Sequence, residues 1–211
     1  SYLGSLVVGA GLFSMFLFLG LYLQTVLGYT PLRSGFAFLP FTAGIIVFAG
    51  VASQLLPKFG PKPLMVPGLV AAAVGLLLLT RITPETSYVT HVLPSLLIMS
   101  SGMALVFIPL STTSLHGVGN RDAGVASALL NTSQQVGGSL GTALLNTIAA
   151  TAATSYMTSN PDKTPPFGIT HGFTVAFTVS AALLLVGAVV LFFFINIGKE
   201  AVVETEGAIA H

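Results

Sequence analysis

Long apolar stretches without a charged side chain dominate the sequence. Six of them are separated by short segments that hold the charges: Ser1–Leu32, Ser34–Pro57, Pro63–Thr80, Thr86–Asn120, Ala123–Pro161 and Thr164–Gly198. A membrane-spanning helix needs about 20 mainly apolar residues, so each stretch can hold one span. Unbroken apolar runs such as Leu191–Phe194 exclude membrane β-strands, in which polarity alternates. The pattern therefore predicts six transmembrane helices.

Turn-forming residues between these stretches set the expected boundaries of the helices. We place the spans at about Leu3–Leu27, Phe36–Leu56, Leu64–Arg81, His91–Leu115, Gly124–Thr151 and Gly172–Ile197. The longest connection is expected at Thr158–His171, which contains an Asn-Pro and a Pro-Pro pair. Asp122 precedes the fifth span, and its carboxylate is expected to cap that helix by accepting from amides of the first turn.

Composition favours a lipid environment and excludes several other classes of protein. Charged residues make up 6% of the chain and hydrophobic residues 54%, whereas soluble domains carry about 25% charged residues. A disordered chain would need low hydrophobicity and high charge. A net charge of +1 gives no basic surface for nucleic acid. The sequence has no cysteine for thiolate ligands, and we expect neither a metal nor a cofactor.

The charges between the spans predict the orientation. An even number of spans places both termini on one side of the membrane. Lys58, Lys62, Arg121 and Lys199 would share that side, against Arg33, Arg81 and Lys163 on the other. This distribution favours cytoplasmic termini, with a helical bundle over 1–198 and a cytoplasmic tail over 199–211. Four tyrosines fall at the opposite ends of the spans, where an aromatic belt would contact lipid headgroups: Tyr22, Tyr29, Tyr88 and Tyr156.

The six spans differ in polarity. The third has no hydrogen-bonding side chain between its ends, and the sixth is polar only near its start. A span that is apolar all round is expected to face lipid over most of its surface. The fifth span instead carries a polar stripe at three- and four-residue spacing, formed by Ser127, Asn131, Gln135, Thr142 and Asn146.

Gln135 lies near the middle of the predicted membrane. It is roughly 16 Å beyond Gly124 at a rise of about 1.5 Å per residue, in a hydrocarbon core about 30 Å thick. An amide at that depth must face protein or a wet cavity. Two interpretations stay open: Asn131 and Gln135 hydrogen-bond to neighbouring helices, or they line a cavity. The nearby glycines indicate close helix packing: Gly137, Gly138 and Gly141.

The spans contain no acidic side chain, and three histidines lie at span ends: His91, His116 and His171. Proton relays in membranes usually use buried carboxylates or histidines, so this chain alone offers no proton carrier. A rhomboid-type serine protease would need Ser101 and His171 within hydrogen-bonding distance. Ser101 lies about 15 Å below the outer end of its helix, while His171 lies at the outer mouth. We therefore do not expect an enzyme.

Several motifs resemble one transporter family. Tyr22-Leu23-Gln24, Gly28–Gly35 and Leu39-Pro40 resemble the start of the second half of the drug:proton antiporter-2 group, the fourteen-span exporters of the major facilitator superfamily. Lys58–Leu64 resembles the basic cytoplasmic loop of that half, although Pro57 stands where the motif often has an acid. The stretch Gly124–Gly141 resembles the penultimate helix.

The resemblance implies that these 211 residues are the C-terminal half of an exporter. That half is an all-α bundle of two inverted three-helix repeats, with substrate bound near the midplane between the halves. Its third and sixth helices face lipid. The implied partners are the missing N-terminal half, a lipophilic drug-like substrate, protons carried by the missing half, and the bilayer of the cell membrane. The implied mechanism is alternating access.

The resemblance also groups the candidate residues by role. Hydrogen bonding and stacking in the substrate cavity are assigned to Gln24, Ser101, Asn131, Gln135, Phe16 and Phe107. The loop with Lys58, Gly60 and Lys62 either favours one conformational state or only holds the topology. Two alternatives come from other classes: a free-standing six-span protein that dimerises to form a pore, and a membrane scaffold that transports nothing. The size of the native gene product and substrate accumulation in intact cells separate them.

Overall fold

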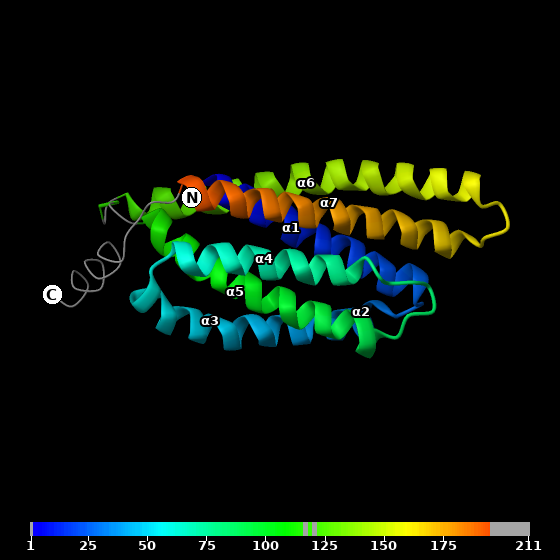
Figure 1. Cartoon of the computed structure of the whole chain (residues 1–211), viewed down its shortest axis with the longest axis horizontal. Helices are drawn as coiled ribbons and strands as arrows, with labels where there is room; N and C mark the ends of the chain where they lie inside the picture. The colour runs from blue at the N-terminus through cyan, green and yellow to red at the C-terminus, as the bar shows by residue number, and fades with distance from the viewer. Residues whose placement is uncertain (1, 116–117, 120–121, 195–211) are drawn as a thin grey trace.

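The computed structural model describes residues 2–115, 118–119 and 122–194. The predicted tail 199–211, with His116 and Arg121, lies outside the described residues. Within them the chain forms helices and no strands, in the order of Figure 1. The elements are α1 (Tyr2–Leu21) with a π-helical extension η1 (Tyr22–Val26), α2 (Pro31–Ala37), α3 (Leu39–Phe59), α4 (Lys62–Leu79), π-helical η2 (Tyr88–Val92) leading into α5 (Leu93–Leu115), α6 (Ala123–Ser159) and α7 (Pro165–Phe194). The predicted all-α fold class is confirmed.

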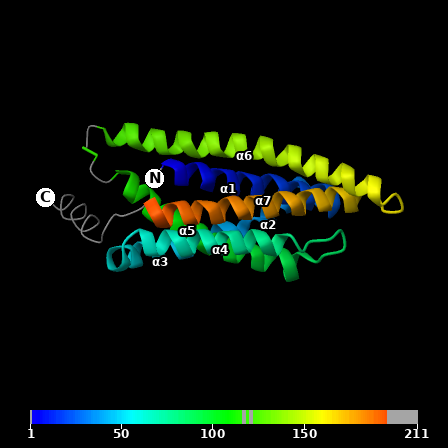
Figure 2. The ribbon, with the colours of Figure 1, turned by 45° about the horizontal axis from the view of Figure 1, so that its top comes forward.

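Five helices of the described chain are long and apolar enough to cross a membrane: Gly4–Val26, Pro31–Phe59, Lys62–Leu79, Tyr88–Ser114 and Pro165–Phe193. α6 is also long enough, with 37 residues, but recurring polar side chains keep its hydropathy below that of the other five. It packs beside α1 and α7 along one side of the bundle (Figure 2). Its assignment as a sixth span stays a prediction.

The connection between α6 and α7 is shorter than expected. Instead of Thr158–His171, it comprises only the residues between the two helix ends, 160–164. The side-chain amide of Asn160 closes α6 by donating to the carbonyl oxygen of Tyr156 at 3.0 Å. Pro165 begins α7, because the first helical position does not need an N–H group. The proline pair that predicted a loop therefore starts a helix.

Asp122 does not cap α6 with its side chain. Its carboxylate makes no capping hydrogen bond, while its backbone carbonyl accepts from the N–H of Ala126 at 3.0 Å. The backbone of Asp122, at φ −102° and ψ −3°, is helical rather than extended, and side-chain caps usually require the extended conformation. The predicted carboxylate cap is wrong for this reason.

The helices pair across two groups of three. In chain order, α1, α3 and α4 form the first group, and α5, α6 and α7 form the second. The first helix of each group packs on the second helix of the other, which gives the pairs α1 with α6 and α5 with α3, while α4 packs on α7. The helices α1 and α5 run in opposite directions (Figure 1). This arrangement is the one expected of two inverted three-helix repeats.

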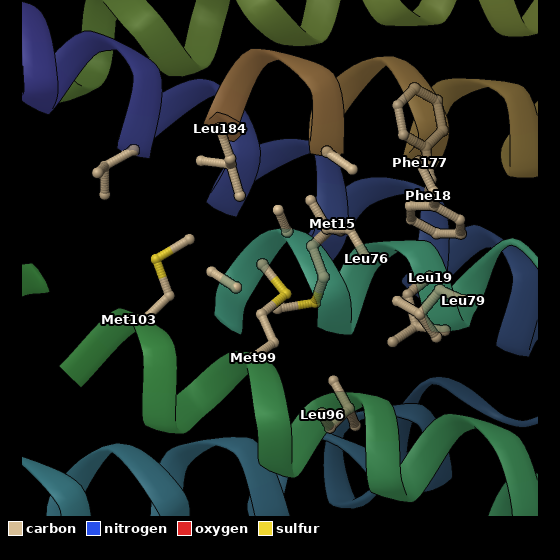
Figure 3. Packing of buried hydrophobic residues seen from close by; sticks show 14 of the residues in the cluster. Met15, Phe18, Leu19, Leu76, Leu79, Leu96, Met99, Met103, Phe177 and Leu184 are labelled. Atoms are coloured by element: carbon tan, nitrogen blue, oxygen red, sulfur yellow. The ribbon is translucent and has the colours of Figure 1, made fainter. Parts of the chain in front are cut away.

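Four helices contribute to the central core in Figure 3, with Met15, Phe18 and Leu19 from α1, Leu76 and Leu79 from α4, Leu96, Met99 and Met103 from α5, and Phe177 and Leu184 from α7. The ring of Phe18 lies 6.3 Å from that of Phe177, edge to face, and 5.7 Å from that of Phe173. Such edge-to-face pairs add to the stabilisation from burial. The core therefore fixes α1 against α7 in the middle of the bundle.

The third span was predicted to face lipid over most of its surface. The corresponding helix α4 has only about half of its residues available for lipid. Half of this helix is buried inside the bundle, including Leu69 and Leu76, because it packs between α5 and α7. The contact with α5 is close: a Cβ atom added to Gly68 would lie 2.7 Å from the carbonyl oxygen of Gly102. Apolar composition alone does not distinguish a protein neighbour from lipid.

At the end of the bundle where α2 lies, two tyrosine hydroxyls form hydrogen bonds to backbone carbonyls of other segments. The hydroxyl of Tyr22 donates to the carbonyl oxygen of Thr83 at 2.7 Å, and that of Tyr88 donates to the carbonyl oxygen of Ala37 at 2.6 Å. Tyr22 is fully buried, which a residue of a lipid-facing belt would not be. These two tyrosines therefore connect segments of the bundle that are far apart in the sequence.

Candidate substrate-binding face

One face of α1 is open along its second half. No side chain between Gly4 and Leu12 is exposed. From Phe13 onward, exposed residues recur every three or four positions. Thr25 is exposed too, but its hydroxyl donates to the carbonyl oxygen of Leu21 in the same helix. We call the other exposed residues the α1 stripe: Phe13, Phe16, Leu17, Leu21 and Gln24. This stripe has two aromatic rings, two aliphatic side chains and one amide. Gln24 lies in the π-helical end of the helix.

Three glycines let α6 cross α1 closely. A Cβ atom at Gly137 would collide with the backbone of Leu6, and one at Gly141 would lie 2.5 Å from the Cβ of Ala10. At Gly138, an added Cβ would lie 2.7 Å from the ring of Phe13. The three glycines singled out from the sequence thus lie at the crossing of α1 and α6.

The exposed surface of α6 includes an apolar and a polar stripe. The apolar stripe consists of Val125, Leu129, Val136, Leu140 and Leu144. The polar stripe expected from the sequence follows another side of the helix, with Asn131, Gln135 and Asn146 exposed and Ser127 and Thr142 partly buried. The exposed residues Thr132 and Ser139 lie between the two stripes. An amphipathic exposed surface of this kind is typical of a helix between lipid on one side and a polar environment on the other.

Gly138 brings the polar stripe next to the α1 stripe. The ring of Phe13 rests on this glycine, and Gln135 and Thr142 lie three residues before it and four residues after it. Residues at this spacing share one face of a helix. The Phe13 ring and the Gln135 amide therefore border the same surface.

The polar stripe has unused hydrogen-bonding capacity. Neither Asn131 nor Gln135 has a side-chain hydrogen bond to any described residue. The hydroxyl oxygen of Thr142 is buried and has no partner in the described part of the chain. A buried polar atom without a partner is costly. Hydrogen bonds between the described helices therefore do not account for the side-chain amides of Asn131 and Gln135.

An aromatic cluster continues the face from α1 to α3. The ring of Phe16 lies 5.1 Å from that of Phe38 and 5.4 Å from that of Phe41, the latter edge to face. Phe13, Phe38 and Phe41 are not among the residues predicted from the sequence. The three-residue spacing of Phe13 and Phe16 was an available signal, but phenylalanine is common throughout the spans.

Two other cavity candidates, Ser101 and Phe107, are half-buried on α5. The Ser101 hydroxyl donates to the carbonyl oxygen of Ile98 in its own helix at 2.7 Å, and Phe107 is partly buried against the central core. The neighbouring Ser100, rather than Ser101, makes the close contact with Gly44 of α3. The His171 ring stacks on Tyr156 at 4.6 Å, and Ser101 and His171 form no pair.

The basic loop is a tight turn between α3 and α4. Gly60 has φ +81°, a conformation that favours glycine, and its N–H donates to the carbonyl oxygen of Leu56 at 2.8 Å. Lys58 is exposed in the last turn of α3. The ammonium of Lys62 lies 4.6 Å from the centre of the Phe192 ring of α7. The two lysines of this loop therefore have different surroundings.

Comparison with known proteins gives consistent matches. The family model described as Major Facilitator Superfamily matches residues 2–142. The puromycin resistance protein pur8 of Streptomyces alboniger is 42% identical over 96% of this chain and 42% of its own length. The cephamycin export protein CmcT of Amycolatopsis lactamdurans is 35% identical over 69% of this chain and 30% of its own. The lincomycin resistance protein LmrB of Listeria monocytogenes is 30% identical over 82% of this chain and 37% of its own.

A solved structure supports the fold. A bacterial homologue of the human drug peptide transporters PepT1 and PepT2 superposes with a TM-score of 0.71 at 20% identity, over 96% of this chain and 43% of that one. The chain thus spans less than half the length of the relatives that it matches.

Proposed function

Because the chain belongs to the Major Facilitator Superfamily, we propose that it forms one wall of the drug-binding cavity of a multidrug exporter. The opposite wall comes from an N-terminal half that the chain does not contain. The six-helix bundle lies in the plasma membrane with its termini in the cytoplasm. Transport follows alternating access, in which the two halves rock around the bound drug.

The observation that carries this proposal is the junction at Gly138. There the aromatic α1 stripe meets the polar stripe of α6. The amides need a polar environment at membrane depth, and nothing in the described chain supplies one. A cavity between two halves meets this need. The apolar stripe, on another side of α6, then contacts lipid.

The chemistry of this wall suits lipophilic compounds with a few polar groups. Phe13 and Phe16 offer exposed ring surface, at 40% and 39%, for stacking. Gln24, Asn131 and Gln135 can each donate and accept hydrogen bonds. Relatives named for puromycin, cephamycin and lincomycin support a wall that accepts drugs of different shapes.

We assign proton coupling to the missing half. Every Asp and Glu within the described residues lies at a helix end or in a loop: Glu85, Asp122 and Asp162. A carboxylate inside a span, which proton relays usually require, must therefore come from elsewhere in the exporter. This assignment leaves the present chain with drug binding and the rocking motion.

The test replaces the amides in the intact exporter. Asn131→Leu and Gln135→Leu keep the approximate size of each side chain and remove its hydrogen bonds. We expect each variant to lower drug efflux several-fold, since a hydrogen bond is worth about 1 kcal/mol, and the double variant to lower it further. The measurement is drug accumulation in cells that contain equal amounts of each variant in the membrane.

Val136→Leu is the matched control. It introduces the same side chain next to Gln135, but on the apolar stripe, and should leave efflux unchanged. Normal efflux by the double amide variant at normal abundance would show that the polar stripe does not line the cavity.

A further inference from the structure

A pocket lies between two connections at the end of the bundle far from the N-terminus. The loop after α4 and the connection between α6 and α7 are both found at that end (Figure 1). The pocket has a volume of about 220 Å³ and is lined by residues 80 and 82–84 of the loop, by Tyr156 of α6, and by residues 167, 170–171 and 174 of α7. We call it the hairpin pocket. No residue of the α1 stripe or of the polar stripe lines it, so it is a separate site.

The hairpin pocket lies outside the hydrocarbon core. The apolar stripe of α6 ends at Leu144, about 29 Å beyond Val125 at 1.5 Å per residue, which matches a core about 30 Å thick. Tyr156 lies beyond that end. Two basic and two acidic residues are neighbours of the pocket in the sequence: Arg81, Glu85, Asp162 and Lys163. Because their charges cancel, the walls of the pocket determine which charge it prefers.

The threonine hydroxyls of the pocket have already donated their hydrogens. Thr80, Thr170 and Thr174 each donate to a backbone carbonyl oxygen of the preceding turn, at 2.6, 2.7 and 2.8 Å. A hydroxyl has one hydrogen and two acceptor lone pairs. These three oxygens can therefore only accept hydrogen bonds from a ligand, which favours a ligand with N–H groups.

Aromatic rings add a preference for positive charge. The rings of Tyr156 and His171 stack with their centres 4.6 Å apart, and Phe167 lines the same pocket. The Lys163 ammonium lies 5.0 Å from the centre of the Phe167 ring, a distance at which the face of a ring attracts a cation. The chain thus already holds an ammonium group against a wall of the pocket.

We propose that the hairpin pocket binds the primary ammonium group of an amphipathic amine. The ammonium takes the place of Lys163 over the Phe167 ring and donates to the threonine hydroxyls. The apolar part of the amine packs on the stacked rings of Tyr156 and His171. A free amine and the ethanolamine headgroup of a phospholipid both carry this group, and the test separates them.

A tryptophan reporter tests the proposal in the full chain, whose sequence has no tryptophan of its own. Phe167→Trp keeps a ring that attracts cations, and Tyr156→Trp is a second reporter in case the first fails to fold. Tryptophan fluorescence is followed in a neutral detergent while 2-phenylethylammonium is added. We expect a saturable change, with a Kd at least tenfold lower than that of 3-phenylpropionate, an anion of similar size.

Lys163→Gln in the reporter background should strengthen the binding of the amine. The variant removes the ammonium that competes for the ring, so the Kd should fall about two- to fivefold. Arg81→Gln is the control, because it removes the same charge from the other connection. It should change the Kd less, since salt screens exposed charges.

Thr174→Val tests the hydrogen bonds to the pocket. It keeps the shape of the side chain and removes the acceptor, so the Kd for the amine should rise at least threefold. Thr178→Val is the matched control. Its hydroxyl makes the same kind of bond one turn further along α7, and it does not line the pocket.

Vesicles identify the source of the ammonium group. The reporter is reconstituted in phosphatidylcholine with or without phosphatidylethanolamine and is titrated with the same amine. A higher Kd with phosphatidylethanolamine means that the lipid headgroup occupies the pocket, and an unchanged Kd means that the ligand is a free amine. Both results support an ammonium site.

Four results would overturn the site. Equal Kd values for the amine and 3-phenylpropionate would exclude a preference for cations, and weaker binding by Lys163→Gln would exclude competition by Lys163. Equal effects of Thr174→Val and Thr178→Val would exclude hydrogen bonds to the pocket, and no saturable change in either reporter would exclude binding. None of these variants changes the drug-binding face, so the two proposals fail independently.

Discussion

At the scale of single residues, the clearest departure from the sequence pattern is Tyr22. Its position at a span end predicts a ring at the lipid headgroups, yet it is fully buried and its hydroxyl donates to the Thr83 carbonyl. This bond ties the end of α1 to the loop between α4 and α5. The polar tip of a tyrosine near a membrane surface can thus be satisfied by a loop as well as by water.

Removal of this hydroxyl should therefore destabilise the fold. Tyr22→Phe keeps the buried ring but loses the bond to Thr83, at a cost of about 1 kcal/mol. The expected result is a midpoint of thermal unfolding in detergent that is lower by about 2–4 °C. Tyr29→Phe is the control, because the Tyr29 ring lies under Arg33 and its hydroxyl has no hydrogen bond to a described residue. Equal midpoints for both variants would mean that the Tyr22 bond contributes nothing.

Side-chain direction is the other residue-scale feature that the sequence left open. In the sequence, Gln135 and Ser101 are both polar residues within a predicted membrane span, with nothing to distinguish them as cavity candidates. In the structure Gln135 is exposed beside the α1 stripe, whereas Ser101 donates to its own helix. A serine can satisfy its hydroxyl within one turn, and a glutamine in a helix cannot do so as readily. This chemical difference explains why the longer side chains are the better candidates.

At the scale of elements, the crossing of α1 and α6 depends on glycine. Gly141→Val should force the helices apart, because even a Cβ atom at this position would lie 2.5 Å from Ala10. We expect a loss of about 1–3 kcal/mol, as for other overpacked contacts, measured as a lower unfolding midpoint. Gly124→Val in the same helix is the control, since nothing lies within 4 Å of a Cβ atom there. If the two variants unfold alike, the crossing does not need its glycines.

The sequence predicts the existence of the elements better than their ends or their neighbours. Apolar runs long enough to span a bilayer identify the helices directly. The end of α6 is missed because the alanines and threonines after Thr151 continue the helix, and the start of α7 is missed because Pro165 begins a helix. The neighbours of α4 are missed for another reason: leucine and alanine pack equally well against protein and against lipid.

At the scale of the whole molecule, the α1 stripe and the polar stripe of α6 lie together on one face of the bundle. The pairing of α1 with α6 and of α3 with α5 leaves both stripes exposed among the described residues. Relatives more than twice as long as this chain have the additional length for a half that covers this face. The open face, the amides without partners and the family all agree with a cavity between two halves.

Reactivity of single cysteines in the intact exporter tests this cavity most directly, because the present chain has no cysteine of its own. In a background freed of any other cysteine, Gln135→Cys should react with a charged, water-soluble maleimide, and a transported drug should slow the reaction. Leu140→Cys, on the apolar stripe of the same helix, should stay unreactive in lipid. Equal reactivity at both positions, or a reactive Leu140→Cys beside an inert Gln135→Cys, would contradict the account.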